Sequence, residues 1–244
     1  MRVFLVSVNR ESAPFPVAPL GIAYVAGAAR KAGHEVELLD LCFSRDVEGD
    51  IDRAVRRFAP ELVGISIRNV DNLTFPASVS YLDEIQAAVA ALRRVSSAPI
   101  VAGGPGFSIF PERLLSLLDL DFGIIGEGEE TFCLLAKHLS NGSRVRDLPN
   151  LIRRGNVAPN VTPKIAPSAG NGLPARDLLD NARYLELGGM ANLQTKRGCP
   201  FECTYCTYPY INGPSLRLRP PTEVVDELAS MVEGAELNQV FLVD

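Results

Sequence analysis

The chain has 244 residues, of which 47% are hydrophobic and 22% charged, and its formal net charge is −5 at pH 7. This length and apolar content suffice for a sizeable core and for more than one domain. The negative charge argues against a general nucleic-acid binder, and no apolar run reaches the length of a membrane span. Residues 1–8 read as a β-strand without a signal cleavage site, so a reducing cytoplasm is the expected compartment.

Up to residue 140, short β-branched runs alternate with amphipathic segments. The runs predict strands at residues 3–8, 35–39, 62–67, 99–102 and 122–125. The amphipathic segments predict helices at residues 19–33, 50–58, 78–95 and 111–118, and a last helix that carries Phe132, Leu135, Ala136 and Leu139 on one face. This alternation predicts an α/β fold, a flavodoxin-like doubly wound parallel sheet in the order 2-1-3-4-5. Its ligand crevice would lie at the carboxyl ends of the strands.

Glycine-containing loops follow three of these predicted strands. They are Pro19-Leu20-Gly21, Gly103-Gly104-Pro105 and Gly126-Glu127-Gly128. Glycine permits positive φ and a close approach of the backbone to a large ligand. Each loop alone is as often structural as functional. Glu127, Glu129 and Glu130 are most simply explained as the start of a helix, where negative charge suits the N-terminal dipole.

Turn signals and prolines interrupt the alternation over residues 141–190. Leu151–Arg154 and Val157–Val161 could form a small hairpin there. We therefore expect a first domain over residues 1–140, a linker over 141–190 and a second domain over 191–244.

A second strand–helix alternation begins near residue 191. The pattern predicts a strand over Asn192–Lys196, a helix over 223–233 capped by Thr222, and a strand over Val240–Val243. The loop after the first of these strands carries the most informative motif of the chain.

Three of the five cysteines, Cys199, Cys203 and Cys206, fall within one short segment with the spacing C-x3-C-x2-C. Three thiolates on one loop can hold a single iron–sulfur cluster, and in a four-iron cluster they leave one iron open to a further ligand. This arrangement indicates a reactive metal site more than a structural one.

Two other interpretations compete with a cluster. A structural zinc site on an interaction protein usually has four Cys or His ligands, and neither His34 nor His138 is near in sequence. Disulfides are the second alternative, but three cysteines cannot all pair and no secretory signal is present. Cys42 and Cys133 lie in apolar surroundings and are expected to be small buried hydrophobic side chains.

The cysteine motif, with the aromatic Tyr205 before its third cysteine, resembles the cluster loop of radical S-adenosylmethionine (SAM) enzymes. The resemblance implies that the three cysteines hold a [4Fe–4S] cluster, that SAM binds the open iron, and that Tyr205 lies near the adenine. With the glycine loops ahead of it, the chain resembles the cobalamin-dependent radical SAM proteins. The implied cobalamin contacts are Pro19, Leu20, Gly21, Gly103, Gly104, Pro105, Gly126, Glu127 and Gly128.

One departure from that family concerns histidine. Many cobalamin domains supply an axial histidine from a D-x-H-x-x-G motif, and neither His34 nor His138 has that context. We therefore expect cobalamin to bind without a histidine of this domain on the cobalt. A domain that keeps the fold but has lost the corrin is the alternative.

The resemblance implies methyl transfer to an unactivated carbon, in which a 5′-deoxyadenosyl radical activates the substrate and methylcobalamin supplies the methyl group. A radical cyclase or rearrangement enzyme of tetrapyrrole or lipid biosynthesis is the alternative. An electron donor such as flavodoxin or ferredoxin is implied, and the small-molecule or peptide substrate and the catalytic residues stay unknown.

The second domain is short for this family. Residues 191–244 provide the start of a partial (β/α) barrel, one strand–helix unit and one more strand. We therefore expect a fragment of a longer enzyme, inactive alone or acting only as a cobalamin-binding module.

Overall fold

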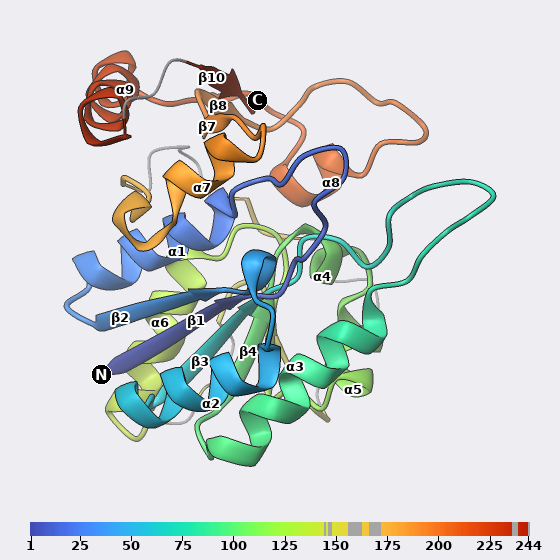
Figure 1. The fold of residues 1–244 in the computed structure, drawn as a ribbon, viewed down its shortest axis with the longest axis vertical. Helices are drawn as coiled ribbons and strands as arrows, with labels where there is room; N and C mark the ends of the chain where they lie inside the picture. Colours follow the sequence, from blue (N-terminus) through green and yellow to red (C-terminus); the bar gives the residue numbers. More distant parts are fainter. Residues whose placement is uncertain (144, 146–147, 156–162, 166–171, 236–238, 244) are drawn as a thin grey trace.

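A six-stranded sheet forms the centre of the computed structural model, which describes the whole chain except residues 144, 146–147, 156–162, 166–171, 236–238 and 244 (Figure 1). The strand order is β2-β1-β3-β4-β5-β6. The strands are β1 Arg2–Ser7, β2 Glu35–Asp40, β3 Leu62–Ser66, β4 Ile100–Gly103, β5 Phe122–Ile124 and β6 Leu151–Arg153. The strands β1 to β5 pair in parallel, so the predicted flavodoxin-like order is confirmed.

The sixth strand corrects the expectation for part of the linker. Leu151–Arg154 was predicted to form half of a hairpin, but Leu151–Arg153 pairs antiparallel with β5 at the edge of the sheet. The reason is burial, because Ile152 is only 3% exposed and belongs to the main core. Val157–Val161, the other half of that hairpin, lies outside the described residues.

Helices cover both faces of the sheet, as strands buried on both sides require. Phe4 and Val6 of β1 pack in one core cluster with α2 and α3, whereas Val3 and Leu5 pack in a second cluster with α1 and α6. These helices are α1 Leu20–Lys31, α2 Val47–Phe58, α3 Leu82–Val95 and α6 Glu129–Ser140 (Figure 1). A short 3-10 turn, η1 Leu41–Phe43, follows β2.

Two helix starts differ from their predicted positions. The helix α2 begins earlier, at Val47, because the Asp46 side chain accepts a hydrogen bond of 3.0 Å from the N–H of Gly49. The helix α3 begins later, at Leu82, because residues 69–81 form a loop that projects from the body (Figure 1).

A short helix, α4 Pro105–Ile109, follows β4 where only a glycine loop was expected, and α5 Pro111–Leu117 comes next. Gly104 turns the chain with φ of 99°, and Pro105 then stands at the first helical position. Proline suits that position because it has no N–H to leave unpaired and its φ is already helical.

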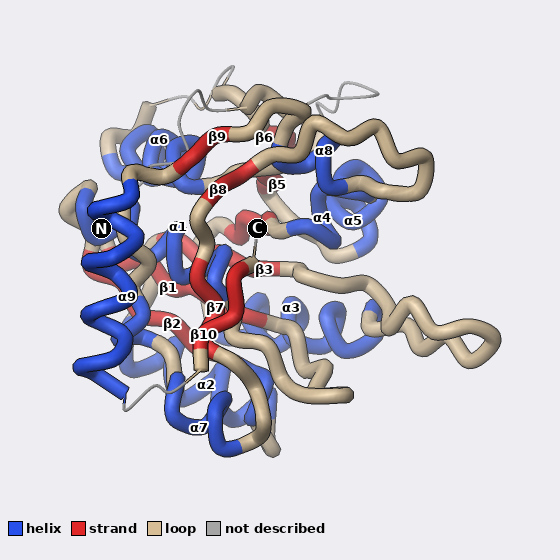
Figure 2. Tube along the Cα trace, turned by 90° about the horizontal axis from the view of Figure 1, so that it is seen from above, coloured by secondary structure: helices blue, strands red, loops and turns tan. Residues whose placement is uncertain are grey.

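The residues after 175 form a smaller layer above the sheet (Figures 1 and 2). Its elements are η2 Arg176–Leu178, α7 Asn181–Glu186, β7 Ala191–Leu193, β8 Lys196–Arg197, α8 Tyr208–Asn212, β9 Arg217–Leu218, α9 Pro221–Ala235 and β10 Val240–Leu242. As the alternation predicted, β7 and β10 pair in parallel with α9 between them in the sequence.

Two details of this layer correct the sequence interpretation. The single strand predicted over Asn192–Lys196 is divided, because Lys196–Arg197 turns away from β7 to pair antiparallel with β9. The helix α9 begins at Pro221, so Thr222 lies inside its first turn and is not the residue that precedes the helix.

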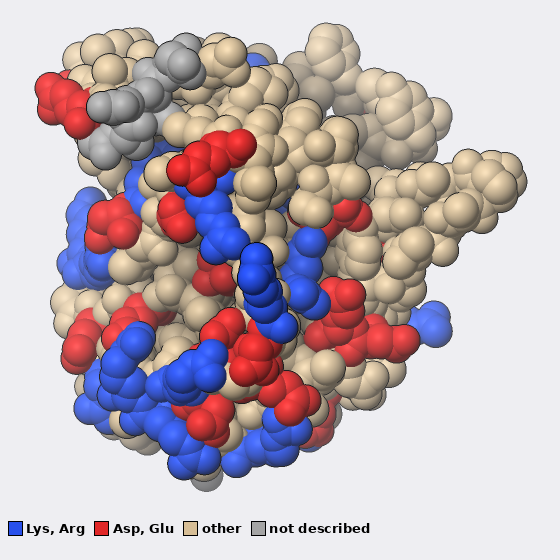
Figure 3. Space-filling view, in the orientation of Figure 1, with Lys and Arg blue, Asp and Glu red and all other residues tan. Residues whose placement is uncertain are grey.

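Charged side chains are unevenly spread over the face drawn in Figure 3, where they intermingle over α2 and α3. The projecting loop carries none between residues 72 and 81. Its Leu73 and Phe75 are 90% and 95% exposed. Within the part of the chain that the structure describes, no helix has both the length and the hydropathy needed to cross a bilayer.

Candidate functional site

A cavity of about 570 Å³ lies at the carboxyl ends of β1, β3, β4 and β5. Cofactor and small-molecule sites are usually about 300–1,000 Å³, so this volume is typical of them. The sequence-predicted residues Pro19, Leu20, Gly21, Gly103, Gly104, Pro105, Gly126, Glu127 and Gly128 all line it. Three separate loops therefore meet at one place, as expected at the carboxyl edge of a doubly wound sheet.

Two of the glycines in these loops are required by the backbone itself. Gly104 and Gly126 have φ of 99° and 75°, values that other residues rarely adopt. A Cβ on Gly104 would also lie 2.7 Å from the carbonyl oxygen of Ile67, and one on Gly126 would lie 3.1 Å from that of Ile211. The two glycines thus keep the cavity wall close to the segments behind it.

Two polar residues in the cavity wall were not singled out from the sequence. Asn9 follows β1 and is buried, and its Oδ1 has no hydrogen-bond partner among the described residues. Arg68 follows β3 and is half-buried, and burial lowers the pKa of its guanidinium. Both residues follow the carboxyl end of a strand. That position is the one sequence signal that could have identified them as candidate site residues.

This polar lining fits a large amide-bearing cofactor such as a corrin. A buried acceptor without a partner is unfavourable by about 1–3 kcal/mol, and an amide N–H from a ligand would satisfy it. Neither His34 nor His138 lines the cavity. His34 precedes β2 at the opposite edge of the sheet, and His138 in α6 hydrogen-bonds the carbonyl oxygen of Leu134 at 2.8 Å.

The cysteine loop rises from the β8–β9 ribbon. Its base is closed at Gly198, whose φ is 84° and where a Cβ would lie 2.1 Å from the carbonyl oxygen of Ser215. The N–H of Cys199 donates to the carbonyl oxygen of Gly213 at 3.1 Å, and the N–H of Cys206 donates to that of Cys203 at 3.1 Å. These bonds fix the two ends of the cysteine motif.

The three thiols of this loop are a suitable donor set for an iron–sulfur cluster, but they are not gathered. Cys199 is partly buried, Cys203 and Cys206 are exposed, and Tyr205 is 88% exposed. No group of three or more His, Cys, Asp or Glu side chains within the described ranges is arranged to hold a metal ion. Holding a cluster would therefore require the loop to draw its thiols together.

The two remaining cysteines are less buried than predicted, because both are only partly covered. Burial raises the pKa of the Cys42 thiol and raises that of Cys133 to about 11. Neither lines the cavity.

A cluster of four ionic side chains joins the cavity wall to the base of the cysteine loop. We call Glu127, Glu129, Arg197 and Arg217 the glutamate–arginine clamp. Arg197 Nη2 lies 2.6 Å from Glu129 Oε1, and Arg217 grips both carboxylate oxygens of Glu127, with Nη1 2.9 Å from Oε2. All four side chains are 6–8% exposed. The simple helix-start interpretation of the glutamates is therefore incomplete.

The electrostatics of the clamp favour the charged form of Arg197. Burial opposes the charge of Arg197, but the carboxylates of Glu129 and Glu127 outweigh it and raise its pKa. The guanidinium also lies 5.0 Å from the ring centroid of Tyr24, which lines the cavity from α1. Burial, followed by the charge of Glu227, raises the pKa of Tyr24 to about 12, so this phenol stays neutral.

A second buried ionic group holds α9 against α1 and η2. Glu227 is 1% exposed and lies 2.6 Å from Arg219 Nη1 and 2.5 Å from Arg176 Nη2. Arg219 Nη1 also donates to the Tyr24 hydroxyl at 3.0 Å. The ion pairs thus brace the upper layer internally, and the hydrogen bond from Arg219 to Tyr24 joins that layer to α1.

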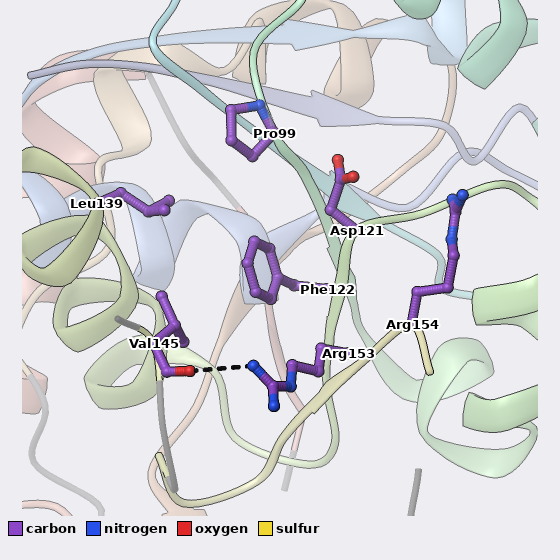
Figure 4. A pocket seen from close by; sticks show the side chains of 7 residues that line it. All are labelled: Pro99, Asp121, Phe122, Leu139, Val145, Arg153 and Arg154. Carbon is purple, nitrogen blue, oxygen red and sulfur yellow. Dashed lines mark hydrogen bonds between the residues drawn. The ribbon is translucent and has the colours of Figure 1, made fainter. Parts of the chain in front are cut away.

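A second cavity, of about 640 Å³, lies at the opposite edge of the sheet (Figure 4). Pro99, Asp121 and Phe122 line it beside Arg153 and Arg154, and Arg153 points toward the carbonyl oxygen of Val145. None of the residues predicted to bind a cofactor lines it.

Comparisons with known proteins identify the family of the sheet-bearing part. The model of the B12 binding domain family matches residues 6–136. The tryptophan 2-C-methyltransferase of Streptomyces laurentii is 29% identical over 92% of this chain and 46% of its own length. The hopanoid C-3 methylase of Methylococcus capsulatus is 27% identical over 93% of this chain and 42% of its own length. The chain therefore spans about half the length of these curated relatives.

A solved structure is similar over the whole chain. It is the radical SAM methyltransferase TsrM from Kitasatospora setae, determined with cobalamin and a [4Fe–4S] cluster bound. It matches with a TM-score of 0.86 and 28% identity, over 100% of this chain and 47% of that one. This likeness extends through the cysteine loop.

Proposed function

The chain belongs to the B12 binding domain family, and we propose that it is the cobalamin- and cluster-binding part of a radical SAM enzyme that transfers a methyl group to an unactivated carbon. One observation carries this proposal. The residues that flank the cysteine motif, Arg197 before it and Tyr208 and Ile211 after it, line the same cavity as the three glycine loops. A cluster on that loop would therefore stand next to a corrin in the cavity.

The cavity residues would bind and orient the corrin. The loops Pro19–Gly21, Gly103–Pro105 and Gly126–Gly128 would bring backbone close to it, and Asn9 Oδ1 would accept from one of its amides. Arg68 adds a positive charge to the wall. Neither His34 nor His138 lines the cavity, so we expect a bound cobalamin to take no histidine ligand from this domain.

The cysteine loop would supply the metal ligands. Cys199, Cys203 and Cys206 would each give a thiolate to a [4Fe–4S] cluster, and Tyr205 would lie beside the adenine of SAM on the open iron. When bound, these groups supply the radical and methyl-transfer chemistry, which protein side chains cannot provide. Because the thiols of Cys203 and Cys206 are exposed, a rearrangement of the loop that brings them toward Cys199 would displace no packed side chain of the core.

For the substrate and the electron donor, the proposal names only the class of molecule. We expect a small molecule or peptide as the methyl acceptor and a flavodoxin or ferredoxin as the source of electrons. The names of the relatives, which act on tryptophan and on hopanoids, differ too much to select one substrate.

Metal analysis after anaerobic reconstitution tests the proposal. We expect iron in an amount near one four-iron cluster per chain. The triple variant Cys199→Ala, Cys203→Ala, Cys206→Ala should lose the iron but keep bound hydroxocobalamin. Stoichiometric zinc without iron would contradict the cluster and support a structural zinc site.

Methyl transfer is tested separately with SAM that carries an isotope label on its methyl group. Label that passes from SAM to the protein-bound corrin supports the methyltransferase. Cleavage of SAM with no label on a corrin would contradict it and favour the alternative of a radical cyclase or rearrangement enzyme.

A further inference from the structure

The cysteine loop depends on a very short ribbon for its position. Arg197 of β8 pairs with Arg217 of β9, and this pair of residues forms the neck from which residues 198–216 extend. Each strand of the ribbon has only two residues. A two-stranded ribbon of this kind is marginal by itself in water, so something else must hold the neck in place.

The two neck residues are also the two arginines of the clamp. Arg197 pairs with Glu129 and Arg217 pairs with Glu127, and both glutamates belong to the segment that leaves β5 along the cavity wall. The clamp therefore connects the base of the cysteine loop directly to the wall on which a corrin would rest.

The chemistry of the clamp favours precise placement over stability. A well-packed apolar contact would stabilise such an interface as well as a buried ion pair does, because desolvation of the charges offsets their attraction. A planar guanidinium on two carboxylate oxygens, in contrast, sets both a distance and an orientation. The contact between Arg217 and Glu127 has this two-point geometry.

We propose that Glu127, Glu129, Arg197 and Arg217 are positioning residues, which hold the cysteine loop at a fixed distance and angle above the cavity so that a cluster faces the corrin. This inference rests on the proposed function, and it assigns to the clamp the alignment of the two metal centres. The clamp residues do not bind either metal.

The test uses Glu129→Gln and Arg217→Lys, with Glu130→Gln as the matched control. Glu130 is the next residue in the same helical turn but is exposed. Arg217→Lys keeps the positive charge but loses the two-point contact with Glu127 and the hydrogen bond to the carbonyl oxygen of Asn212. Because the charge stays, it should preserve the fold if Glu129→Gln does not. Each chain is loaded anaerobically, and its iron and corrin contents are measured first.

The first readout is the magnetic interaction between the reduced cluster and paramagnetic Co(II) of the corrin, observed by electron paramagnetic resonance. We expect Glu129→Gln and Arg217→Lys to keep their metals but to lose or shift the splitting seen in the parent chain. Glu130→Gln should match the parent. Clamp variants with full metal content and the parent splitting would overturn the inference.

The second readout needs no cofactor and separates this inference from the proposed function. Hydrogen exchange of the neck amides, residues 196–199 and 217–219, should accelerate in the metal-free clamp variants while β1 and β3 stay protected as in the parent. A parent chain that binds neither iron nor corrin would contradict the proposed function alone. Unchanged exchange at the neck would contradict the clamp.

Discussion

Asn9 illustrates how much a single side chain can reveal about the site. Its amide oxygen is buried in the cavity wall without a partner among the described residues. No sequence pattern marks it, because an asparagine after a strand is ordinarily a turn residue. Only the folded arrangement shows that it lines the cavity at the carboxyl ends of the strands.

Replacement of Asn9 by Leu should separate stability from binding. The variant removes an unsatisfied buried group, so the free energy of unfolding should stay equal or rise. Loss of one hydrogen bond to the corrin, about 1 kcal/mol, should weaken hydroxocobalamin binding about fivefold. Urea unfolding and an absorbance titration measure the two effects. Unchanged corrin affinity would show that Asn9 has no ligand contact.

Asp40 gives a prediction that depends on pH. Burial raises the pKa of its carboxyl, although hydrogen bonds from the Tyr184 hydroxyl and the N–H of Cys42 oppose the rise. A raised pKa in the folded state means that ionisation above the unfolded value, about 4, weakens the fold.

Asp40→Asn should therefore stabilise the chain at pH 7, because the amide keeps an acceptor and carries no charge. The gain should shrink as the pH falls from 7 to about 3, below the unfolded pKa, where the carboxyl of the parent is protonated in both states. Free energies of unfolding at the two pH values measure the difference. A variant that is less stable at pH 7 would contradict this assignment.

The elements of the fold follow closely from hydrophobic periodicity. Buried runs such as Val3–Val6 locate the parallel strands, and the carboxyl-edge rule then brings the glycine loops to one cavity. The sequence could not reveal α4, whose start depends on the positive φ of Gly104. It located an extended segment at Leu151–Arg154 but not the pairing of β6 with β5. The arginine partners of Glu127 and Glu129 could not be predicted either, because they lie 90 and 68 positions away in the sequence and leave no local pattern.

Two glycine substitutions test these loops at the level of the elements. Gly104→Ala should destabilise the fold by about 2 kcal/mol or more, because φ is 99° and the Ile67 carbonyl lies 2.7 Å from the new Cβ. Gly21→Ala, where nothing lies within 4 Å of a Cβ, should raise stability by about 0.5–1 kcal/mol. Thermal unfolding measures both, and equal effects would contradict the backbone argument.

At the scale of the whole molecule, one buried ionic group joins the upper layer to the sheet-bearing part and another braces that layer internally. One is the glutamate–arginine clamp, and the other places Glu227 of α9 between Arg176 and Arg219. The cavity lies beneath this layer, so the cavity stays covered only while the layer is attached.

Glu227→Gln should destabilise the chain by about 3 kcal/mol, because it leaves the buried Arg219 and the partly buried Arg176 without their shared carboxylate. Asp226→Asn is the matched control, since Asp226 is the preceding residue of the same helix and is exposed. Its effect should stay within about 0.5 kcal/mol. Chemical denaturation compares the two, and a similar small effect for both would show that the ionic group does not hold α9.

The corrin retained after gel filtration, measured as bound cobalt per chain, tests the central claim most directly. Gly103→Leu fills the cavity at the carboxyl ends of the strands, where a Cβ on Gly103 has no neighbour nearer than 3.6 Å. Leu139→Phe fills the opposite cavity. We predict stoichiometric cobalt in the parent chain and in Leu139→Phe, and its loss in Gly103→Leu. A parent chain that retains no corrin, or a Gly103→Leu variant that retains it fully, would contradict the account.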